Sequence, residues 1–360
     1  MPKILFIGAH RFNRSPSQRF RFEQYFSFLE KNGFVCHLSA LLDEKDDQNF
    51  YNQGDIIGKA VVIVKSFFRR RRDVRMARDY DILFIQREAF MTGSIYFEKH
   101  FKKSGKKMIF DFDDAVWLPN ISESNKKFEW LKNPGKTSDL ISLADKVIAG
   151  NRYLAEYAGR YNGSVIVIPT TIDIEYHIRK PIEKKDGRIC IGWTGSHTTI
   201  QHFERAVSVL KMLKEKYGDN IYFKVIGDSS YENMELGIRG FPWKFETEIA
   251  DLLEIDIGIM PLPDDEWARG KCGLKGLQYM ALEIPCVMSP VGVNTEIVSD
   301  GLNGFLASTE EEWVEKISKL IESAELRKRI GIEARQTVVE SYSVESQKEK
   351  YLACLRELLP

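Results

Sequence analysis

The sequence predicts an α/β protein made of two Rossmann-like domains, each built on a parallel sheet. Two apolar runs, KILFIG at 3–8 and RICIGW at 188–193, are typical of a buried first strand in such a sheet. After each run, further strand patterns alternate with helical patterns, as they do in doubly wound folds. A length of 360 residues also suits two domains.

In the first half, a polar loop over 10–19 leads into a helix that carries Phe22, Tyr25 and Phe26 on one face. Gly33 is expected to end that helix, because glycine tolerates the left-handed backbone found there. The other predicted elements of this half are strands at 34–38, 82–86, 108–111, 146–149 and 165–169 and a helix at 140–144.

In the second half, a turn over 194–197 leads into a helix over 199–217. The segment 174–187 is rich in Lys, Glu and Asp and holds Pro181, so it is the predicted linker between the halves. The remaining predicted elements are strands at 222–226, 255–260 and 286–289 and helices at 309–323 and 325–340.

Composition excludes several function classes. Lys+Arg and Asp+Glu are both 52, so no overall basic character points to nucleic acid. The five cysteines are scattered without a C-x-x-C pair, and no signal-peptide pattern precedes the first strand, so we expect a cytoplasmic protein. No run of 18 apolar residues occurs, which argues against a membrane span.

The stretch from 270 to 306 contains the most informative motif. It predicts a polar turn, an amphipathic helix, a buried strand at 285–289 and a loop rich in Gly and Asn. Lys271 and Lys275 are four residues apart and are expected to share one helix face near its N-terminus. Two ammonium groups beside unpaired backbone N–H groups would bind phosphate.

This stretch resembles the donor-binding segment of retaining glycosyltransferases of family four, which have the GT-B fold. Met280, Ala281, Pro285 and the loop 290–296 fit the family pattern. The family's Glu-x7-Glu pair does not fit, because its two positions are Gly270 and Gln278.

The resemblance implies two parallel-sheet domains that face each other across a cleft, with domains at 1–173 and 188–341 and a last helix over 342–360 that crosses back to the first domain. It also implies a nucleotide diphosphate sugar as co-substrate. Gln278 would then accept a hydrogen bond from a ribose hydroxyl. The role of the missing glutamate at Gly270 would pass to a neighbour, with Glu296 or the backbone N–H groups of the loop residues Val293, Asn294 and Thr295 as candidates.

Polar residues follow the predicted strands at the same end each time. Ligands of open α/β sheets bind beyond the carboxyl ends of strands, so this pattern predicts a binding site along each edge. The clusters are Gly8–His10, Gln86–Glu88, Asp111–Asp114, Thr194–His197 and Gly227–Asp228. Gly195 and Ser196 are expected to present N–H groups to a phosphate, and His10, His197 and Glu88 are further candidates; the other four histidines are interpreted as structural.

Asp113 and Asp114 are the candidate catalytic residues, because relatives place a group that contacts the transferred sugar at this strand end. A carboxylate there can accept hydrogen bonds from sugar hydroxyls or stabilise positive charge at the reacting carbon. Two alternatives remain open: an Asp-x-Asp metal site, which two Rossmann-like domains argue against, and an N-cap of the next helix.

The first loop lacks the paired glycines that relatives usually have. Arg14, Arg19 and Arg21 flank it, and Arg19 is expected to replace the missing backbone contact with phosphate or acceptor. Surface arginines without a ligand are the alternative.

Seven basic residues lie between Lys65 and Arg78, beside Phe67 and Phe68. Such a cluster predicts a peripheral contact with an anionic membrane at the inner face of the cell membrane, or else a solvated surface.

The predicted activity is transfer of a sugar from a nucleotide diphosphate to a hydroxyl of a glycan or lipid-linked acceptor. We expect retention, no metal and no cofactor, and a role in cell-surface polysaccharide or glycoconjugate biosynthesis. The alternatives are a GT-B sugar-nucleotide epimerase and a non-catalytic nucleotide-sugar-binding protein.

Overall fold

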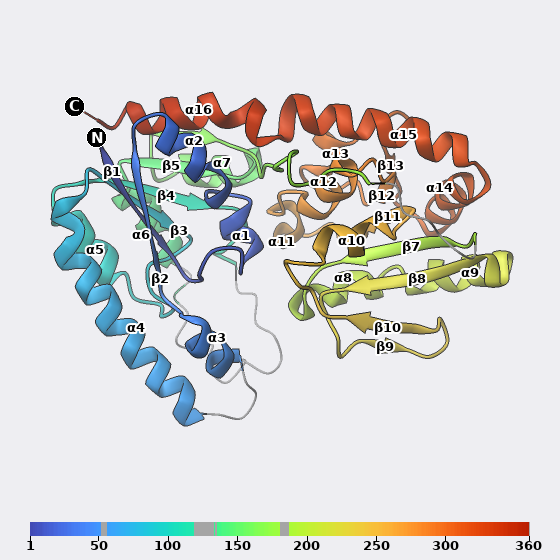
Figure 1. Ribbon diagram of the computed structural model, residues 1–360, viewed down its shortest axis with the longest axis horizontal. Coiled ribbons are helices and arrows are strands. Elements are labelled where there is room, and N and C mark those ends of the chain that lie inside the picture. The colour runs from blue at the N-terminus through green and yellow to red at the C-terminus, as the bar shows by residue number, and fades with distance from the viewer. Residues whose placement is uncertain (52–55, 119–132, 134, 181–186, 360) are drawn as a thin grey trace. The chain divides into compact units, whose positions relative to one another are not determined.

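The computed structural model describes residues 1–51, 56–118, 133, 135–180 and 187–359, and it contains two compact units (Figure 1). Unit 1 comprises 1–170 and 347–360, and unit 2 comprises 171–346. Each unit is built on its own sheet of mainly parallel strands, so the predicted α/β class with two parallel-sheet domains is confirmed.

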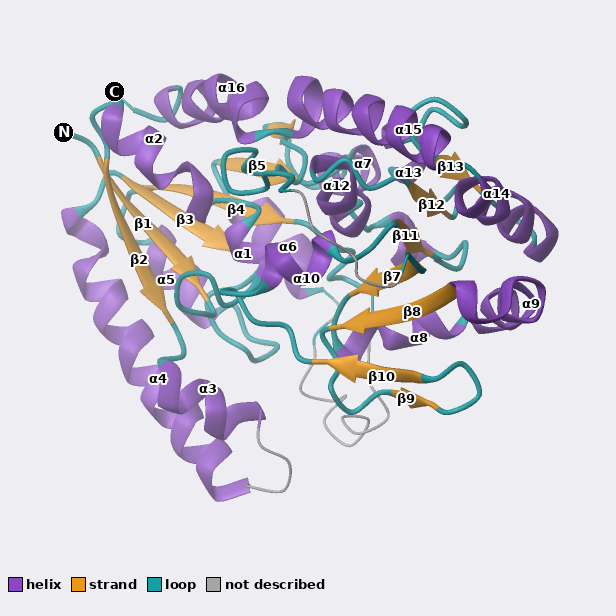
Figure 2. Ribbon diagram, turned by 45° about the vertical axis from the view of Figure 1, so that its right-hand side comes forward, coloured by secondary structure: helices purple, strands orange, loops and turns teal. Residues whose placement is uncertain are grey.

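Unit 1 holds a six-stranded sheet in the order β2-β1-β3-β4-β5-β6, and all five pairings are parallel. Figure 2 shows β2, β1, β3 and β4 side by side with their arrowheads at one end, which places their polar carboxyl ends along one edge. The strands are β1 (Lys3–Gly8), β2 (Val35–Ala40), β3 (Ile82–Gln86), β4 (Lys107–Phe112), β5 (Lys146–Ala149) and β6 (Val165–Val167).

The α-helices assigned wholly to unit 1 are α1 (Pro16–Arg19), α2 (Phe26–Lys31), α3 (Glu44–Tyr51), α4 (Ile56–Met76), α5 (Tyr96–Lys102), α6 (Lys136–Leu143) and α7 (Arg152–Gly159). Short 3-10 turns at η1 (Glu23–Tyr25) and η2 (Ala77–Asp79) interrupt the helices. The last helix, α16 (Val344–Arg356), adds Tyr351 to this core, where its ring stacks on Tyr25 at 4.2 Å between centroids.

Unit 2 holds a seven-stranded sheet in the order β13-β12-β11-β7-β8-β10-β9, in which only the β9–β10 pairing is antiparallel. Its strands are β7 (Ile189–Thr194), β8 (Ile221–Ile226), β9 (Glu232–Asn233), β10 (Ile238–Phe241), β11 (Ile257–Met260), β12 (Cys286–Met288) and β13 (Phe305–Leu306). The core on one side of this sheet includes Trp193, Phe203 and Leu210, all buried.

The helices of unit 2 are α8 (Ile200–Glu204), α9 (Val207–Tyr217), α10 (Glu248–Leu253), α11 (Glu266–Arg269), α12 (Leu274–Ala281), α13 (Asn294–Ile297), α14 (Glu310–Glu322) and α15 (Ala324–Thr337). They are joined by 3-10 turns at η4 (His197–Thr199) and η5 (Gly218–Asn220), and a π turn, η6 (Val338–Tyr342), follows α15.

Several predicted elements were wrong in detail. The helix expected over 199–217 is broken into η4, α8 and α9. The polar loop over 10–19 contains α1, and the aromatic helix after it is divided into η1 and α2. The β9–β10 hairpin and α13 were not predicted, because each is too short to show a periodic pattern.

Candidate functional site

The turn after β7 is closed by glycines that no other residue can replace. A Cβ on Gly195 would lie 2.1 Å from the ring of Trp193, and a Cβ on Gly227 would lie 1.8 Å from the carbonyl oxygen of Gly195. Gly227 also has a φ of +107°, which favours glycine. The turns after β7 and β8 are therefore packed backbone against backbone.

This packing corrects one part of the prediction. The N–H of Gly195 donates to the carbonyl of Ile226 at 2.9 Å, and the N–H of Ser196 donates to Oγ1 of Thr199 at 3.0 Å. The N–H of Thr194 donates to the hydroxyl of Tyr279. These three N–H groups already have partners inside the protein, so they are not presented to a phosphate as expected.

His197 points from the start of η4 toward Asp228 after β8, with Nδ1 3.0 Å from Oδ2 of the carboxylate. The other carboxylate oxygen accepts hydrogen bonds from the N–H and hydroxyl of Ser230. Although burial acts to raise it, these hydrogen bonds hold the pKa of Asp228 below its usual value. The pair joins the ends of β7 and β8 at the predicted strand edge.

The two lysines do not share a helix face, which is a second correction. The chain turns at Gly273, whose φ is +71°, and α12 begins only at Leu274. Lys271 therefore lies in the connection between α11 and α12, and Lys275 lies in the first turn of α12. Each ammonium lies over an indole ring: Lys271 Nζ is 4.8 Å from the centroid of Trp267, and Lys275 Nζ is 5.3 Å from that of Trp193.

Both lysines act electrostatically on one buried side chain, His202 of α8. Burial first, and then the charges of Lys275 and Lys271, lower the pKa of His202 to about 4. Its Nε2 atom is buried and has no hydrogen-bond partner among the described residues. His202 was interpreted as structural from the sequence, and no spacing motif distinguished it from the other histidines.

Gln278 of α12 is buried and contacts a residue that the sequence did not indicate. Its Nε2 donates to Oε1 of Glu248, at the start of α10, over 3.1 Å. The indole N–H of Trp243 donates to the same oxygen at 3.0 Å.

The predicted loop around 294–296 forms the short helix α13. The backbone N–H groups of Asn294 and Thr295 donate to the carbonyls of Val291 and Gly292, so they are engaged in the turn rather than available to a donor. Asn294 is fully buried, with Nδ2 bonded to the carbonyl of Ser289 and Oδ1 lacking a partner among the described residues. Thr295 and Glu296 are exposed.

In unit 1, Asp113 and Asp114 both contact Arg87, which sequence reasoning missed. Arg87 Nε lies 2.7 Å from Asp113, and Nη2 lies 2.6 Å from Asp114. Although desolvation opposes it, the two carboxylates raise the pKa of Arg87. Arg87 has a φ of +60°, a strained conformation for a residue with a side chain.

The expectation of a helix cap at Asp113 or Asp114 is not met, because the chain up to residue 118 forms turns and not a helix. Among the described residues, no group of three or more His, Cys, Asp or Glu side chains is placed to hold a metal ion.

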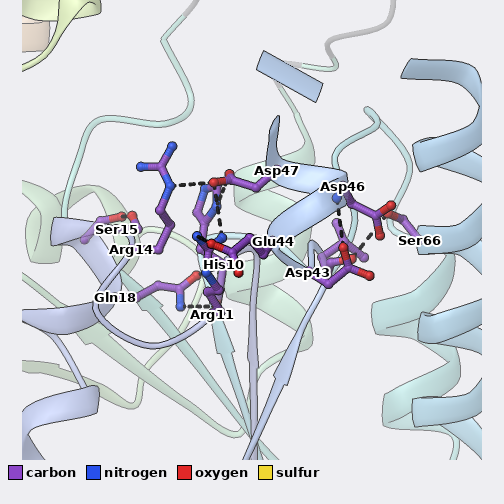
Figure 3. Close-up of polar contacts among 12 residues, drawn as sticks. His10, Arg11, Arg14, Ser15, Gln18, Asp43, Glu44, Asp46, Asp47 and Ser66 are labelled. Carbon is purple, nitrogen blue, oxygen red and sulfur yellow. Dashed lines mark hydrogen bonds and ion pairs between the residues drawn. The ribbon is translucent and has the colours of Figure 1, made fainter. Parts of the chain in front are cut away.

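The other candidates of unit 1 lie in charge networks at the same edge (Figure 3). His10 Nδ1 is 3.5 Å from Asp47 of α3, which also accepts from Arg14 at 2.6 Å. Glu88 accepts from Lys136 Nζ at 2.7 Å. Arg19 is buried, with its guanidinium 4.7 Å from the ring centroid of Phe20, so the alternative of a surface arginine does not hold for it.

The basic cluster forms the second half of α4, and it corrects the expected membrane contact in part. Arg70 is fully buried and donates to the carbonyls of Gly8 and Ala89, so it cannot pair with lipid phosphates. Phe67 packs on Phe97 with ring centroids 5.2 Å apart, whereas the side chain of Phe68 is exposed. No described helix is both long enough and apolar enough to span a bilayer.

Comparison with known proteins relates this chain to glycosyltransferases. Residues 176–337 match the family model described as "Glycosyl transferases group 1". The chain is 25% identical over 308 residues to an uncharacterized glycosyltransferase of Methanocaldococcus jannaschii, MJ1069, covering 78% of this chain and 76% of that protein.

Solved structures show the same fold. A glycosyltransferase from Rickettsia africae ESF-5 superposes with a TM-score of 0.70 at 16% identity, over 99% of this chain and 98% of that one. The Anabaena protein HepE in complex with UDP-glucose gives a TM-score of 0.69 at 13% identity, over 99% and 100% of the two chains. The fold is therefore GT-B.

Proposed function

We propose that the protein transfers a sugar from a nucleotide diphosphate to a hydroxyl of a glycan or lipid-linked acceptor, with retention of the anomeric configuration. The observation that carries the proposal is the placement of Lys271 and Lys275 over the indole rings of Trp267 and Trp193, inside the segment that matches the glycosyltransferase model. Two ammonium groups beside a tightly packed turn suit a diphosphate leaving group.

In this proposal the two lysines stabilise the negative charge of the leaving diphosphate. As the bond to the sugar breaks, negative charge grows on the diphosphate, and fixed positive charges stabilise it more than they stabilise the intact donor. This neutralisation removes the need for a divalent metal. Retention follows if an oxygen of the departing diphosphate takes the proton of the acceptor hydroxyl on the same face, as the family resemblance implies.

Asp113 and Asp114 remain the proposed catalytic carboxylates of unit 1, with Arg87 as the group that orients both. A guanidinium that binds two carboxylates fixes their rotamers, and a carboxylate can accept more than one hydrogen bond.

One observation favours a second candidate function. Gly270 and Gln278 occupy the two positions at which relatives carry glutamate, so a protein that binds a nucleotide sugar without transferring it is the alternative. Epimerisation of the bound sugar is the other outcome that an assay must separate.

A two-step experiment tests the proposal. Thermal shift with UDP, GDP, ADP and CMP identifies the nucleotide, and incubation with the matching labelled sugar donors, with and without EDTA, follows the chemistry. Transfer or slow hydrolysis that persists in EDTA is the expected result, and the anomer of the product reports retention. A changed sugar would indicate an epimerase, and binding without turnover would indicate the non-catalytic alternative.

We also propose that α4 docks unit 1 to an anionic membrane. The buried face of this helix is mostly polar, with Ser66, Arg70 and Asp73 beside Val62, while several apolar side chains of the helix are exposed. The exposed apolar residues follow helical spacing and lead into exposed arginines, in the order Ile57, Val61, Val64, Phe68, Arg71, Arg72 and Arg75. A face of this kind can insert apolar side chains among headgroups while the arginines pair with lipid phosphates.

Sedimentation with anionic and neutral vesicles tests the docking surface. Binding should require anionic lipid, weaken at high salt and be lost in Phe68→Glu, while Met234→Glu, an equally exposed apolar position in unit 2, should bind like the parent. Equal and negligible binding to both vesicle types would contradict the proposal and point to a soluble acceptor.

A further inference from the structure

Unit 2 contains a buried carboxylate that contacts Gln278, one of the proposed nucleotide-binding residues. Glu248 and Gln278 are both largely buried, and they meet through a hydrogen bond of 3.1 Å between side chains that come from α10 and α12. Trp243, in the segment before α10, donates its indole N–H to the same carboxylate oxygen. The carboxylate of Glu248 is thus fixed from two separate segments of the chain.

This contact decides which way the amide of Gln278 faces. An ionised carboxylate can only accept hydrogen bonds, so the NH2 group of the amide must face Glu248. The amide oxygen then faces away from Glu248 and is held as an acceptor. With a neutral partner, the amide could turn over and present a donor instead.

Gln278 is a neighbour of a cation on α12. Lys275 and Gln278 are three residues apart in one helix, which places them on neighbouring positions of one face. A molecule that combines anionic phosphates with a hydroxyl group could therefore contact both side chains at once, and a nucleoside diphosphate has this chemistry.

We infer that Glu248 is a positioning residue for the nucleotide: it holds Gln278 so that the amide oxygen accepts a hydrogen bond from a ribose hydroxyl. The inference rests on the proposed function, because it assumes that unit 2 binds a nucleoside diphosphate. The family that this segment resembles carries a glutamate at the position of Gln278. In this chain the carboxylate belongs to Glu248 of α10, which contacts Gln278.

The arrangement predicts that restoring glutamate at position 278 is harmful. Gln278→Glu would place two carboxylates at hydrogen-bond distance, so that one must take up a proton or move away. The loss of affinity should grow as pH rises, because the shared proton is then lost. Exchanging the two residues in Glu248→Gln/Gln278→Glu restores one carboxylate and one amide and should restore binding.

The experiment measures the Kd of the nucleotide that the parent binds most tightly among UDP, GDP and ADP, by calorimetry at pH 6.5 and 8.0. We expect at least about a tenfold weaker Kd for Gln278→Glu at pH 8.0, a smaller loss for Glu248→Gln, and a Kd within about threefold of the parent for the exchanged pair. Glu246→Gln, an exposed carboxylate two residues before Glu248, is the matched control and should bind like the parent.

Thermal unfolding of each variant without nucleotide separates positioning from a merely structural role. Lower melting temperatures with unchanged Kd would overturn the inference, as would tighter binding by Gln278→Glu or failure of the exchanged pair to recover. Trp243→Phe, which removes the indole N–H donor and keeps an aromatic ring, though a smaller one, is a milder variant and should weaken binding without unfolding unit 2. A parent that binds none of the three nucleotides would instead overturn the proposed function on which this inference rests.

Discussion

At the strand-end edge of unit 1, positive side chains contact carboxylates, as Arg87 does with Asp113 and Asp114. In unit 2, Lys271 and Lys275 lie over the indole rings of Trp267 and Trp193. An ion pair neutralises a cation, whereas an aromatic face stabilises it with little loss of its outward field. The comparison teaches that the guanidinium at the edge of unit 1 orients two carboxylates, while the two lysines of unit 2 are positioned by aromatic faces.

The largest effect should come from the buried ion pair of unit 1. Arg21 and Asp111 are both buried, with Nη2 2.5 Å from Oδ1, so Asp111→Asn would leave a guanidinium without its counter-charge. We expect a loss of about 3–5 kcal/mol in the free energy of unfolding, measured by urea denaturation. Asp79→Asn, an exposed control, should change stability by less than about 0.5 kcal/mol. A loss of similar size in both variants would contradict a structural role specific to this pair.

The next effect is a pH dependence of opposite sign in the two units. Burial raises the pKa of Glu23 in unit 1 to about 7, against hydrogen bonds from Asn13 and Gln18, and burial with two lysines lowers the pKa of His202 in unit 2 to about 4. The contribution of Glu23 to the free energy of unfolding is fully present below about pH 4.5 and is lost as pH rises through 7. That of His202 is fully present above about pH 6.5 and is lost as pH falls through 4.

Each contribution should amount to about 2–3 kcal/mol. Relative to the parent, Glu23→Gln should gain stability as pH rises from 5 to 8, and His202→Gln should gain stability as pH falls from 6.5 to 4.5. Urea denaturation at four pH values checks both signs. Parallel curves for the parent and either variant would show that the group in question titrates normally in the folded protein.

A third prediction concerns the lysines. Lys271→Ala or Lys275→Ala should weaken binding of the nucleoside diphosphate by about 1.5–3 kcal/mol, the range for charge-assisted hydrogen bonds, with little change in unfolding. Calorimetric titration beside the exposed control Lys319→Ala measures the difference. If both variants bind like the control, the two lysines do not bind the diphosphate, and the difference between the units has no functional role.

The smallest expected effect lies at Asp113. Asp113→Asn should lower turnover at least about tenfold, close to 1.4 kcal/mol in the barrier, while the Kd of the nucleotide stays within about twofold. The measurement pairs steady-state rates with calorimetry, and Asp139→Asn serves as an exposed control in the same unit. Turnover per folded molecule equal to that of the parent would assign Asp113 to a structural pair with Arg87.

Strands such as β1 and β7 were predictable because each is a short apolar run that its sheet buries from both sides. The break at Gly273 was not predicted, because helical spacing alone placed both lysines in one helix. Glu248 lies 30 residues from Gln278 in sequence, so only the packing of α10 on α12 reveals their contact. The four consecutive arginines at 69–72 likewise gave no sign that Arg70 is the buried one, because the buried positions of α4 include polar side chains as well as Val62.

Trp193 gives the proposed donor site an optical reporter of its own. The indole is fully buried against Gly195, and the ammonium of Lys275 lies over its ring. An indole emits at a wavelength that depends on the electric field across its ring, and an anion that binds Lys275 would change that field. Nucleotide binding should therefore shift the emission of Trp193, one of the six tryptophans in the chain, and the shift should be reduced in Trp193→Phe, with Trp267 under Lys271 giving the remainder. Occupancy of unit 2 can then be followed in real time without a labelled donor.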